Sequence, residues 1–350
     1  MTLNVVANHN KEISGIQNYS DFLLKYLNSI NVKYNLIAPS ESNSIVKIIK
    51  KILSFLGFNG EKILNDFPIF LKIPKIGTVH FTSQQQAIAL LFSKPTKSIV
   101  TVHDIAPLAT KKYNSSLEKI LYKLVYKGLK KADYFFADSE STKKDLIHYL
   151  NISSQKINVI PLGVDHEKYY SSKTKREKNT ILYVGSEMPR KNLKTLFEAI
   201  AIIKKKIPDI KLIKIGRPQW KNAREELIDL ASQIGISENI VFKEDIDNLS
   251  EEYQKCTVFV FPSLYEGFGL PLLEAMACKC AVLSSNRTSL PEIGGDAVKY
   301  FDPENKNELA VEIYAVLTNE ILRKELEIKA YKRSLQFSWE RTVAETIKNY

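Results

Sequence analysis

A stretch of 34 residues, Thr257–Leu290, constrains the fold of this chain more than any other part of its sequence. It predicts a buried strand (Val258–Phe261), a loop rich in proline and glycine (Pro262–Pro271), a short helix (Leu272–Ala277) and a second strand (Ala281–Ser284). A glycine-rich turn that leads from a strand into a helix presents backbone N–H groups and the positive end of the helix dipole. The stretch therefore predicts a phosphate-binding turn in an α/β sheet.

Two carboxylates, Glu266 and Glu274, lie in this stretch with seven residues between them. A carboxylate one turn into the helix can accept hydrogen bonds from the vicinal hydroxyls of a ribose. Gly267 and Gly269 let a ligand approach the backbone closely, and Pro271 suits the first turn of the helix. The alternative is that Glu266 only caps a turn and that Glu274 is a solvated helix residue. For two carboxylates at this spacing alone, the second interpretation is the more common one, so both interpretations stay open here.

Strand patterns alternate with helix patterns along both halves of the chain. The other expected strands are Leu3–Ala7, Val32–Ala38, Thr78–Phe81, Ser98–Val102, Tyr134–Ala137, Ile157–Ile160, Ile181–Val184, Lys211–Ile215, Ile240–Phe242 and Val298–Phe301. A polar, charged segment, Ser171–Asn179, separates the two halves as a linker, and Trp339–Asn349 predicts a final helix. This alternation predicts two parallel, doubly wound sheets, each in a domain of its own.

The net charge of +11 is concentrated in the first half, where residues 1–165 hold 21 lysines, 12 acidic residues and no arginine. A basic surface suggests an anionic partner. Without a recognition motif or an arginine for base contacts, we do not expect nucleic acid. Two basic helix patterns, Ser44–Phe58 and Leu117–Lys131, favour weak association with an anionic membrane surface. The alternatives are a helix packed on the core and a solvated basic face.

No apolar run approaches the roughly 20 residues that span a bilayer, and the first residues do not resemble a secretion signal. We therefore expect a cytoplasmic protein, peripheral at the inner face of the cell membrane. The three cysteines, Cys256, Cys278 and Cys280, have no matching set of ligands downstream. They predict buried free thiols and no metal site.

Four further segments of interest follow expected strands. Gly15 lies in a turn between a strand and a helix, which fits a plain βα turn as well as a phosphate site. His103 with Asp104 follows the strand Ser98–Val102, where the carboxyl ends of parallel strands form a ligand crevice, and the alternative for a single histidine is a structural role. Asp138 or Ser139 is expected to cap the next helix. The loop Gly185–Asn192 carries adjacent cations, Arg190 and Lys191, which can neutralise a diphosphate leaving group.

These motifs resemble the retaining glycosyltransferases of family 4. The specific part is the block E-G-F-G-L-P-L-L-E (266–274) together with P-R-K-N (189–192). Corroboration comes from the glycine turn near Gly15, H-D at 103–104, A-D-S at 137–139, I-P-L-G-V-D at 160–165, Y-V-G-S at 183–186 and F-S-W-E at 337–340. The resemblance covers nearly the whole chain. It implies the GT-B fold, with two Rossmann-like, doubly wound parallel-sheet domains that face a cleft.

The resemblance also implies a division of labour between domains. Residues 1–168 would bind the acceptor, residues 169–335 would bind the nucleotide-sugar donor, and residues 336–350 would form a helix that returns to the first domain. The donor would be a nucleotide-diphosphate sugar, with GDP-mannose or UDP-glucose expected from their frequency in the family. The acceptor would be a glycan or a lipid-linked glycan. Nothing in the sequence indicates the oligomeric state.

Individual roles are implied position by position. Arg190 and Lys191 would clamp the diphosphate, and Glu274 would bind the ribose. Glu266 and the backbone of Gly267, Phe268, Gly269 and Leu270 would contact the donor sugar and its phosphate. Gly15 and Gly185 would line the donor site, and His103 would lie beside the reacting face of the sugar. The resemblance thus makes His103, Glu266, Arg190 and Lys191 the catalytic set, with no metal and no cofactor.

One departure from the family pattern stands out. Many relatives place an arginine shortly after the V-G dipeptide, whereas this chain has Ser186 and Glu187 there. We expect Arg190, beside Lys191, to supply the missing cation.

The implied reaction is hexosyl transfer with retention, in which the acceptor attacks from the face that the nucleotide leaves and a phosphate oxygen takes its proton. A nucleotide-sugar epimerase or a phosphorylase of the same architecture is an alternative, as is a non-catalytic subunit that binds glycan or a partner. The epimerase would need its own acid and base, and the phosphorylase a lysine-bound cofactor and usually a longer chain.

Overall fold

The computed structural model describes residues 2–7, 15–38, 72–172 and 174–350. The chain forms two compact units. Unit 1 comprises Met1–Leu162 together with Trp339–Tyr350, and unit 2 comprises Gly163–Ser338. Each unit contains one six-stranded sheet in which all paired strands are parallel. The prediction of two parallel, doubly wound sheets is therefore confirmed.

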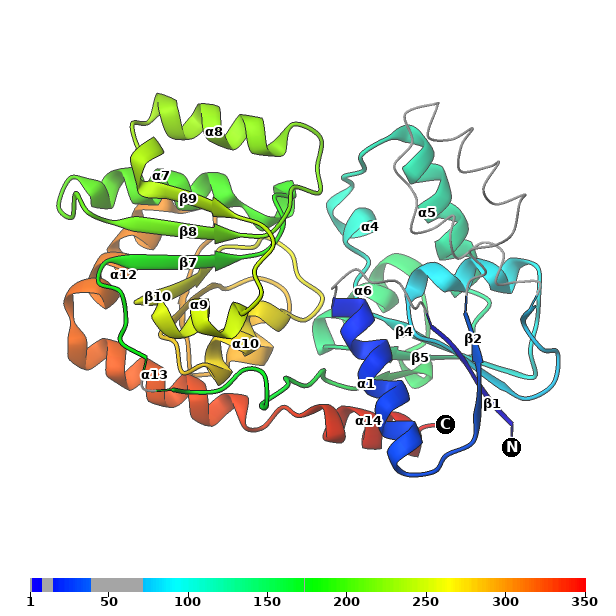
Figure 1. Ribbon diagram of the computed structural model, residues 1–350. Helices are drawn as coiled ribbons and strands as arrows, with labels where there is room; N and C mark the ends of the chain where they lie inside the picture. The colour runs from blue at the N-terminus through cyan, green and yellow to red at the C-terminus, as the bar shows by residue number, and fades with distance from the viewer. Residues whose placement is uncertain (1, 8–14, 39–71, 173) are drawn as a thin grey trace. The chain divides into compact units, whose positions relative to one another are not determined.

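The sheet of unit 1 has the strand order β2-β1-β3-β4-β5-β6. Its strands are β1 (Leu3–Val6), β2 (Tyr34–Ile37), β3 (Thr78–Phe81), β4 (Lys97–Val102), β5 (Tyr134–Ala137) and β6 (Ile157–Val159). Its helices are α1 (Gly15–Ser29), the 3-10 helix η2 (Gln84–Leu91), α4 (Ala106–Thr110), α5 (Ser116–Leu129), α6 (Glu140–Leu150), the 3-10 helix η3 (Ser154–Lys156) and α14 (Trp339–Lys348). Helices flank both faces of the sheet (Figure 1).

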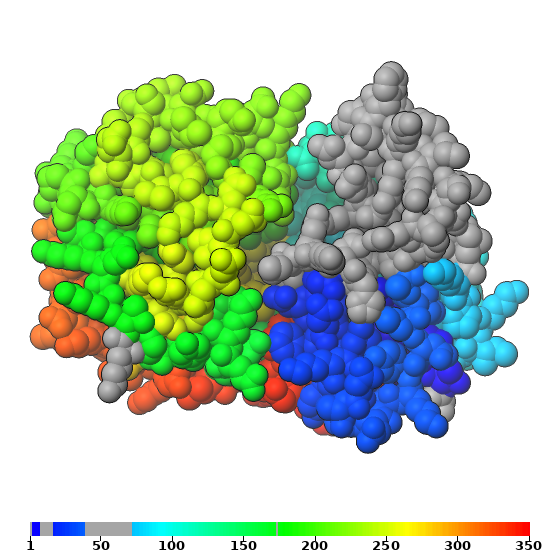
Figure 2. All heavy atoms as spheres, viewed as in Figure 1, coloured from blue at the N-terminus to red at the C-terminus, as the bar shows by residue number. Residues whose placement is uncertain are grey.

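The apolar residues of unit 1 form its core because strands covered on both faces bury every side chain. All four residues of β1 and β3 are buried. Helix α1 is amphipathic: Leu23 and Leu27 are fully buried, and its other face lies at the surface shown in blue in Figure 2. The returning helix α14 packs on α1, where the rings of Phe22 and Trp339 stack with centroids 4.7 Å apart.

The sheet of unit 2 has the strand order β12-β11-β10-β7-β8-β9. Its strands are β7 (Thr180–Val184), β8 (Lys211–Ile215), β9 (Ile240–Lys243), β10 (Val258–Phe261), β11 (Val282–Ser285) and β12 (Lys299–Phe301). The α-helices are α7 (Leu193–Lys204), α8 (Ala223–Gln233), α9 (Leu249–Lys255), α10 (Leu270–Ala277), α11 (Leu290–Gly294), α12 (Lys306–Thr318) and α13 (Glu320–Ser334). Two 3-10 turns, η4 (Pro189–Lys191) and η5 (Ser237–Asn239), complete the unit.

The expected strands all occur, and their ends differ from the expected ends by at most two residues. The expectation for α10 is wrong at its start, since the helix begins at Leu270 rather than Leu272 and Pro271 lies in its first turn. Helix α9 was not expected. The predicted basic helix Ser44–Phe58 lies outside the described residues. Among the residues that are described, no helix is both long and apolar enough to cross a membrane.

A close packing contact in unit 1 gives a stability prediction. A Cβ atom at Gly128 of α5 would lie 2.1 Å from the backbone oxygen of Ala87 in η2. Gly128→Ala should therefore force backbone movement and lower the free energy of unfolding by about 1–3 kcal/mol. Urea unfolding measures the loss, and Lys127→Ala on the exposed face of the same helix serves as the control. Equal midpoints for both variants would show that α5 does not pack on η2 in this way.

Candidate active site

The carboxyl ends of β7 and β10 lie side by side in unit 2. β7 is the first strand of the unit and pairs with β8 on one side and β10 on the other, so the strand order reverses there. Ligands of open α/β sheets bind at such switch points, outside the carboxyl ends of the strands. The loop after β7 carries Arg190 and Lys191, and the loop after β10 carries Glu266. The topology thus explains why residues about 75 positions apart converge.

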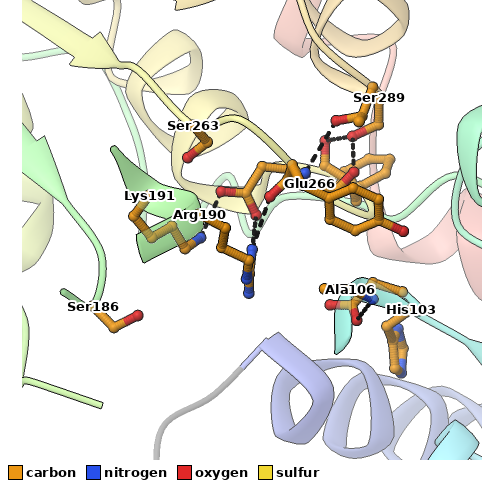
Figure 3. A network of polar contacts seen from close by, with 12 residues as sticks. His103, Ala106, Ser186, Arg190, Lys191, Ser263, Glu266 and Ser289 are labelled. Atoms are coloured by element: carbon orange, nitrogen blue, oxygen red, sulfur yellow. Dashed lines mark hydrogen bonds and ion pairs between the residues drawn. The ribbon is translucent and has the colours of Figure 1, made fainter. Parts of the chain in front are cut away.

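Glu266 is the centre of this site. Its Oε1 accepts a hydrogen bond from Lys191 Nζ at 2.5 Å, and its Oε2 accepts one from Arg190 Nη1 at 3.1 Å (Figure 3). Glu266 and Lys191 are only 7% and 8% exposed. Burial raises the pKa of Glu266, but the Lys191 and Arg190 cations outweigh burial and hold this pKa below its usual value. The site therefore holds an ionised carboxylate between two fixed cations.

Backbone contacts tie the two loops together. Arg190 Nη1 also donates to the carbonyl of Tyr265 at 2.9 Å, and the Leu264 amide donates to the Arg190 carbonyl at 2.8 Å. The Asn192 side-chain amide donates to the carbonyl of Pro262 at 3.1 Å. These bonds hold the loop that carries the cations in a fixed position relative to the loop after β10. A charged site needs such fixed positions.

Ser289 holds the glycine-rich loop from its other side. Its hydroxyl lies 3.0 Å from the carbonyl oxygen of Glu266 and 2.9 Å from that of Phe268, so its single O–H is shared between these two acceptors (Figure 3). The Glu266 amide donates to Thr288 Oγ1 at 3.0 Å. Ser289 is fully buried, and the sequence analysis did not select it. Its only sequence signal is its place just after β11, the strand that neighbours β10.

Two glycines have backbone angles that other residues rarely adopt. Gly269 has a φ of +109° directly before α10, and a Cβ there would lie 2.7 Å from Leu290 Cδ2. Gly185, at the end of β7, has a φ of +152°, and its Cβ would lie 2.7 Å from the Tyr183 hydroxyl. Glycine therefore suits both positions, the loop-to-helix turn at Gly269 and the strand-to-loop turn at Gly185, for conformational and steric reasons.

Glu274 lies one turn into α10 and is 8% exposed. Its Oε2 accepts a hydrogen bond from the Tyr253 hydroxyl at 3.0 Å. The alternative that Glu274 is an ordinary solvated helix residue is therefore wrong. Burial, the largest influence, raises the pKa of Glu274, and the hydroxyls of Tyr253 and Tyr169 lower it in part.

Glu187, the residue that departs from the family pattern, is turned into the interior of unit 2. Its Oε1 accepts hydrogen bonds from Lys214 Nζ of β8 and from Arg224 Nε of α8, the latter at 2.7 Å. Lys214 is fully buried and also donates to the Gly216 carbonyl at 2.6 Å. Glu187 therefore serves as the counter-ion of a buried lysine.

In unit 1, His103 follows β4 and is 8% exposed. Its Nε2 lies 2.9 Å from the carbonyl oxygen of Thr82, which can only accept, and its Nδ1 lies 2.6 Å from Asp138 Oδ2. Burial lowers the pKa of His103, but Asp138 and Thr82 together raise it above its ordinary value. Both ring nitrogens thus face acceptors of the protein. Of the two expected caps of α6, Ser139 is the one that accepts from the Thr142 amide, and Asp138 instead holds His103.

Gly15 is the first residue of α1. The rest of its expected turn, residues 8–14, lies outside the described residues. The structure thus brings together Arg190, Lys191 and Glu266, places Glu274 on the adjoining helix, and places His103 and Gly15 in unit 1.

Two family models match this chain, one over each half. Residues 165–333 match the glycosyl transferases group 1, and residues 13–168 match glycosyltransferase family 4. The chain belongs to the family 4 glycosyltransferases. Over 276 residues this chain is 31% identical to the serotype-specific mannosyltransferase WbdA of Escherichia coli. That match covers 73% of this chain and 33% of WbdA, so the chain spans about a third of that relative.

Two other similar proteins are matched over more of their length. O-antigen chain mannosyltransferase B of Escherichia coli is 28% identical over 273 residues, which are 73% of this chain and 70% of that protein. The structure of sucrose-phosphate synthase from Thermosynechococcus elongatus aligns with 100% of this chain and 98% of that one, with a TM-score of 0.77 and 18% identity. The chain therefore has the GT-B fold.

Proposed function

We propose that this glycosyltransferase moves a hexose, mannose in the first instance and glucose as the alternative, from a nucleotide-diphosphate sugar to a glycan or lipid-linked acceptor, with retention of configuration. The observation that carries the proposal is the buried cluster of Arg190, Lys191 and Glu266 at the switch point of unit 2. Mannose is favoured because two similar proteins are named as mannosyltransferases.

The charges of the cluster suit a diphosphate leaving group. As the bond between the sugar C1 and the phosphate oxygen breaks, negative charge builds on the diphosphate, and Lys191 and Arg190 would neutralise it. Because these two cations supply the positive charge, the proposal assigns no metal to the site. The backbone of residues 267–270, at the N-terminus of α10, would add N–H donors to the sugar and its phosphate.

Retention follows if the acceptor hydroxyl attacks C1 from the face that the nucleotide leaves. The new bond joins C1 to the acceptor oxygen, and the proton of that hydroxyl passes to the departing phosphate oxygen. His103 would lie beside the sugar without transferring a proton, because Thr82 and Asp138 engage both of its nitrogens. The basic face of α5, which exposes Lys119, Lys123 and Lys127, would favour weak association with the cytoplasmic face of an anionic membrane.

Calorimetric titration with UDP, GDP and ADP tests the proposal. We expect one nucleotide to bind clearly, and Glu274→Gln to weaken it by about 1.5–3 kcal/mol because a charge-assisted bond to the ribose is lost. Glu238→Gln, an exposed change in the same unit, is the matched control and should leave binding unchanged. If no nucleotide binds, the non-catalytic alternative takes the place of this proposal. The anomeric configuration of the product, read by NMR, then decides retention.

A further inference from the structure

We infer that Tyr253 is a positioning residue for the nucleotide site, because its hydroxyl fixes the carboxylate of Glu274 from the buried side. The inference rests on the proposed role of Glu274 as the ribose-binding carboxylate. No motif in the sequence marks Tyr253, which lies 21 residues before its partner.

The exposed fractions of Tyr253 and Glu274 show which of the two residues lies deeper in the protein. Tyr253 is fully buried, whereas Glu274 keeps 8% of its surface exposed. The phenol is therefore an interior partner of the carboxylate, and a ligand would reach Glu274 through the small surface that it leaves exposed. The hydrogen bond of 3.0 Å uses Oε2. A carboxylate oxygen offers more than one lone pair, so this bond leaves acceptor capacity for ribose hydroxyls.

Tyr253 is itself held rigidly. Its carbonyl oxygen accepts from the thiols of Cys256, at 3.3 Å, and Cys280, at 2.7 Å. Its ring packs edge-on against Tyr169, with centroids 6.0 Å apart, and against Phe259, 5.5 Å apart. A phenol fixed along its whole length can hold a carboxylate in one orientation, which a flexible side chain cannot do. The thiols are buried and free, as the sequence predicts.

The ionisable groups around Glu274 determine the pH at which it carries charge. They are Tyr253 of α9, Tyr169 and Lys168 of the segment after β6, and Cys278 at the end of α10. Burial raises the pKa of Glu274 above its ordinary value, and Tyr253, Tyr169 and Lys168 each lower it in part. Loss of the Tyr253 hydroxyl should raise this pKa further. A protonated Glu274 accepts weaker hydrogen bonds, so ribose binding should weaken as the pH falls through the pKa.

A ligand pair isolates the ribose contribution from everything else. We would measure, by calorimetry between pH 5 and pH 8, the affinity of the nucleoside diphosphate that binds and of its 2′,3′-dideoxy analogue. Both ligands carry the same titrating diphosphate, so the ratio of their affinities reports only the ribose hydroxyls. We define the ratio as the association constant of the nucleoside diphosphate divided by that of its dideoxy analogue. In the unaltered protein this ratio should fall as the pH falls.

Tyr253→Phe should reduce the ratio about 2- to 12-fold, the equivalent of one hydrogen bond, and should move its fall to higher pH. Tyr300→Phe removes a hydroxyl bonded to the Gly295 carbonyl elsewhere in unit 2, and its ratio should match that of the unaltered protein. Tyr169→Phe provides a second variant should Tyr253→Phe fail to fold, and its ratio should change in the same direction.

The outcomes separate the two proposals. If Tyr253→Phe and Tyr169→Phe both keep the ratio and pH profile of the unaltered protein while Glu274→Gln loses discrimination, the positioning role is wrong and the ribose role stands. If Glu274→Gln itself keeps full discrimination between the two ligands, the ribose role assigned to Glu274 fails. A purely structural role for Tyr253 would lower stability without changing the ratio, and would also contradict the inference.

Discussion

Lys191→Met is expected to lower kcat about 10²- to 10³-fold, the cost of removing one charged group that stabilises a developing anion. Methionine keeps most of the length and apolar bulk of the lysine side chain but carries no charge. Lys191 Nζ is fixed 2.5 Å from Glu266, and both residues are buried, so we expect no solvent cation to take its place. Steady-state sugar transfer, or hydrolysis of the sugar nucleotide where no acceptor is known, measures the effect.

The control for this variant is Lys194→Met, which removes an exposed lysine three residues further on, at the start of α7. Its kcat should equal that of the unaltered protein. Glu266 keeps Arg190 as a partner at 3.1 Å in Lys191→Met, so the variant should fold. A normal kcat for Lys191→Met, with only KM raised, would show that the lysine binds the donor equally in the ground state and the transition state.

The cation cluster could be predicted from sequence because strand ends determine where loops lie. Arg190 and Lys191 follow an apolar strand, Glu266 follows another, and parallel strands send both loops to the same edge of a sheet. The direct ion pairs could not be predicted, since they depend on β7 and β10 being neighbours although α7, β8, α8, β9 and α9 intervene in the chain.

Tyr253 and Ser289 could not be found in this way because their surroundings lack a periodic pattern. The segment of α9, Leu249–Lys255, is mostly polar, so neither a helix nor a buried tyrosine is indicated there. Lys214 did leave a signal. It interrupts the apolar strand β8, and a lysine in a strand buried on both faces requires a buried acid. The sequence does not say which acid, and only the structure identifies Glu187.

Glu187→Gln is expected to lower the free energy of unfolding by about 3–5 kcal/mol, because it leaves the fully buried Lys214 ammonium without its counter-ion. Burial already lowers the pKa of Lys214, and loss of Glu187 should lower it further. The unfolded chain then binds more protons than the folded one, so the deficit should shrink as the pH rises toward 10. Urea unfolding across this pH range measures the deficit in the free energy of unfolding.

The controls are two further variants. Adding Lys214→Met should restore much of the stability, and Glu244→Gln, which alters only the exposed partner of Arg224, should cost little. A deficit that neither shrinks with pH nor responds to Lys214→Met would mean that Glu187 stabilises the unit by its shape and not by its charge.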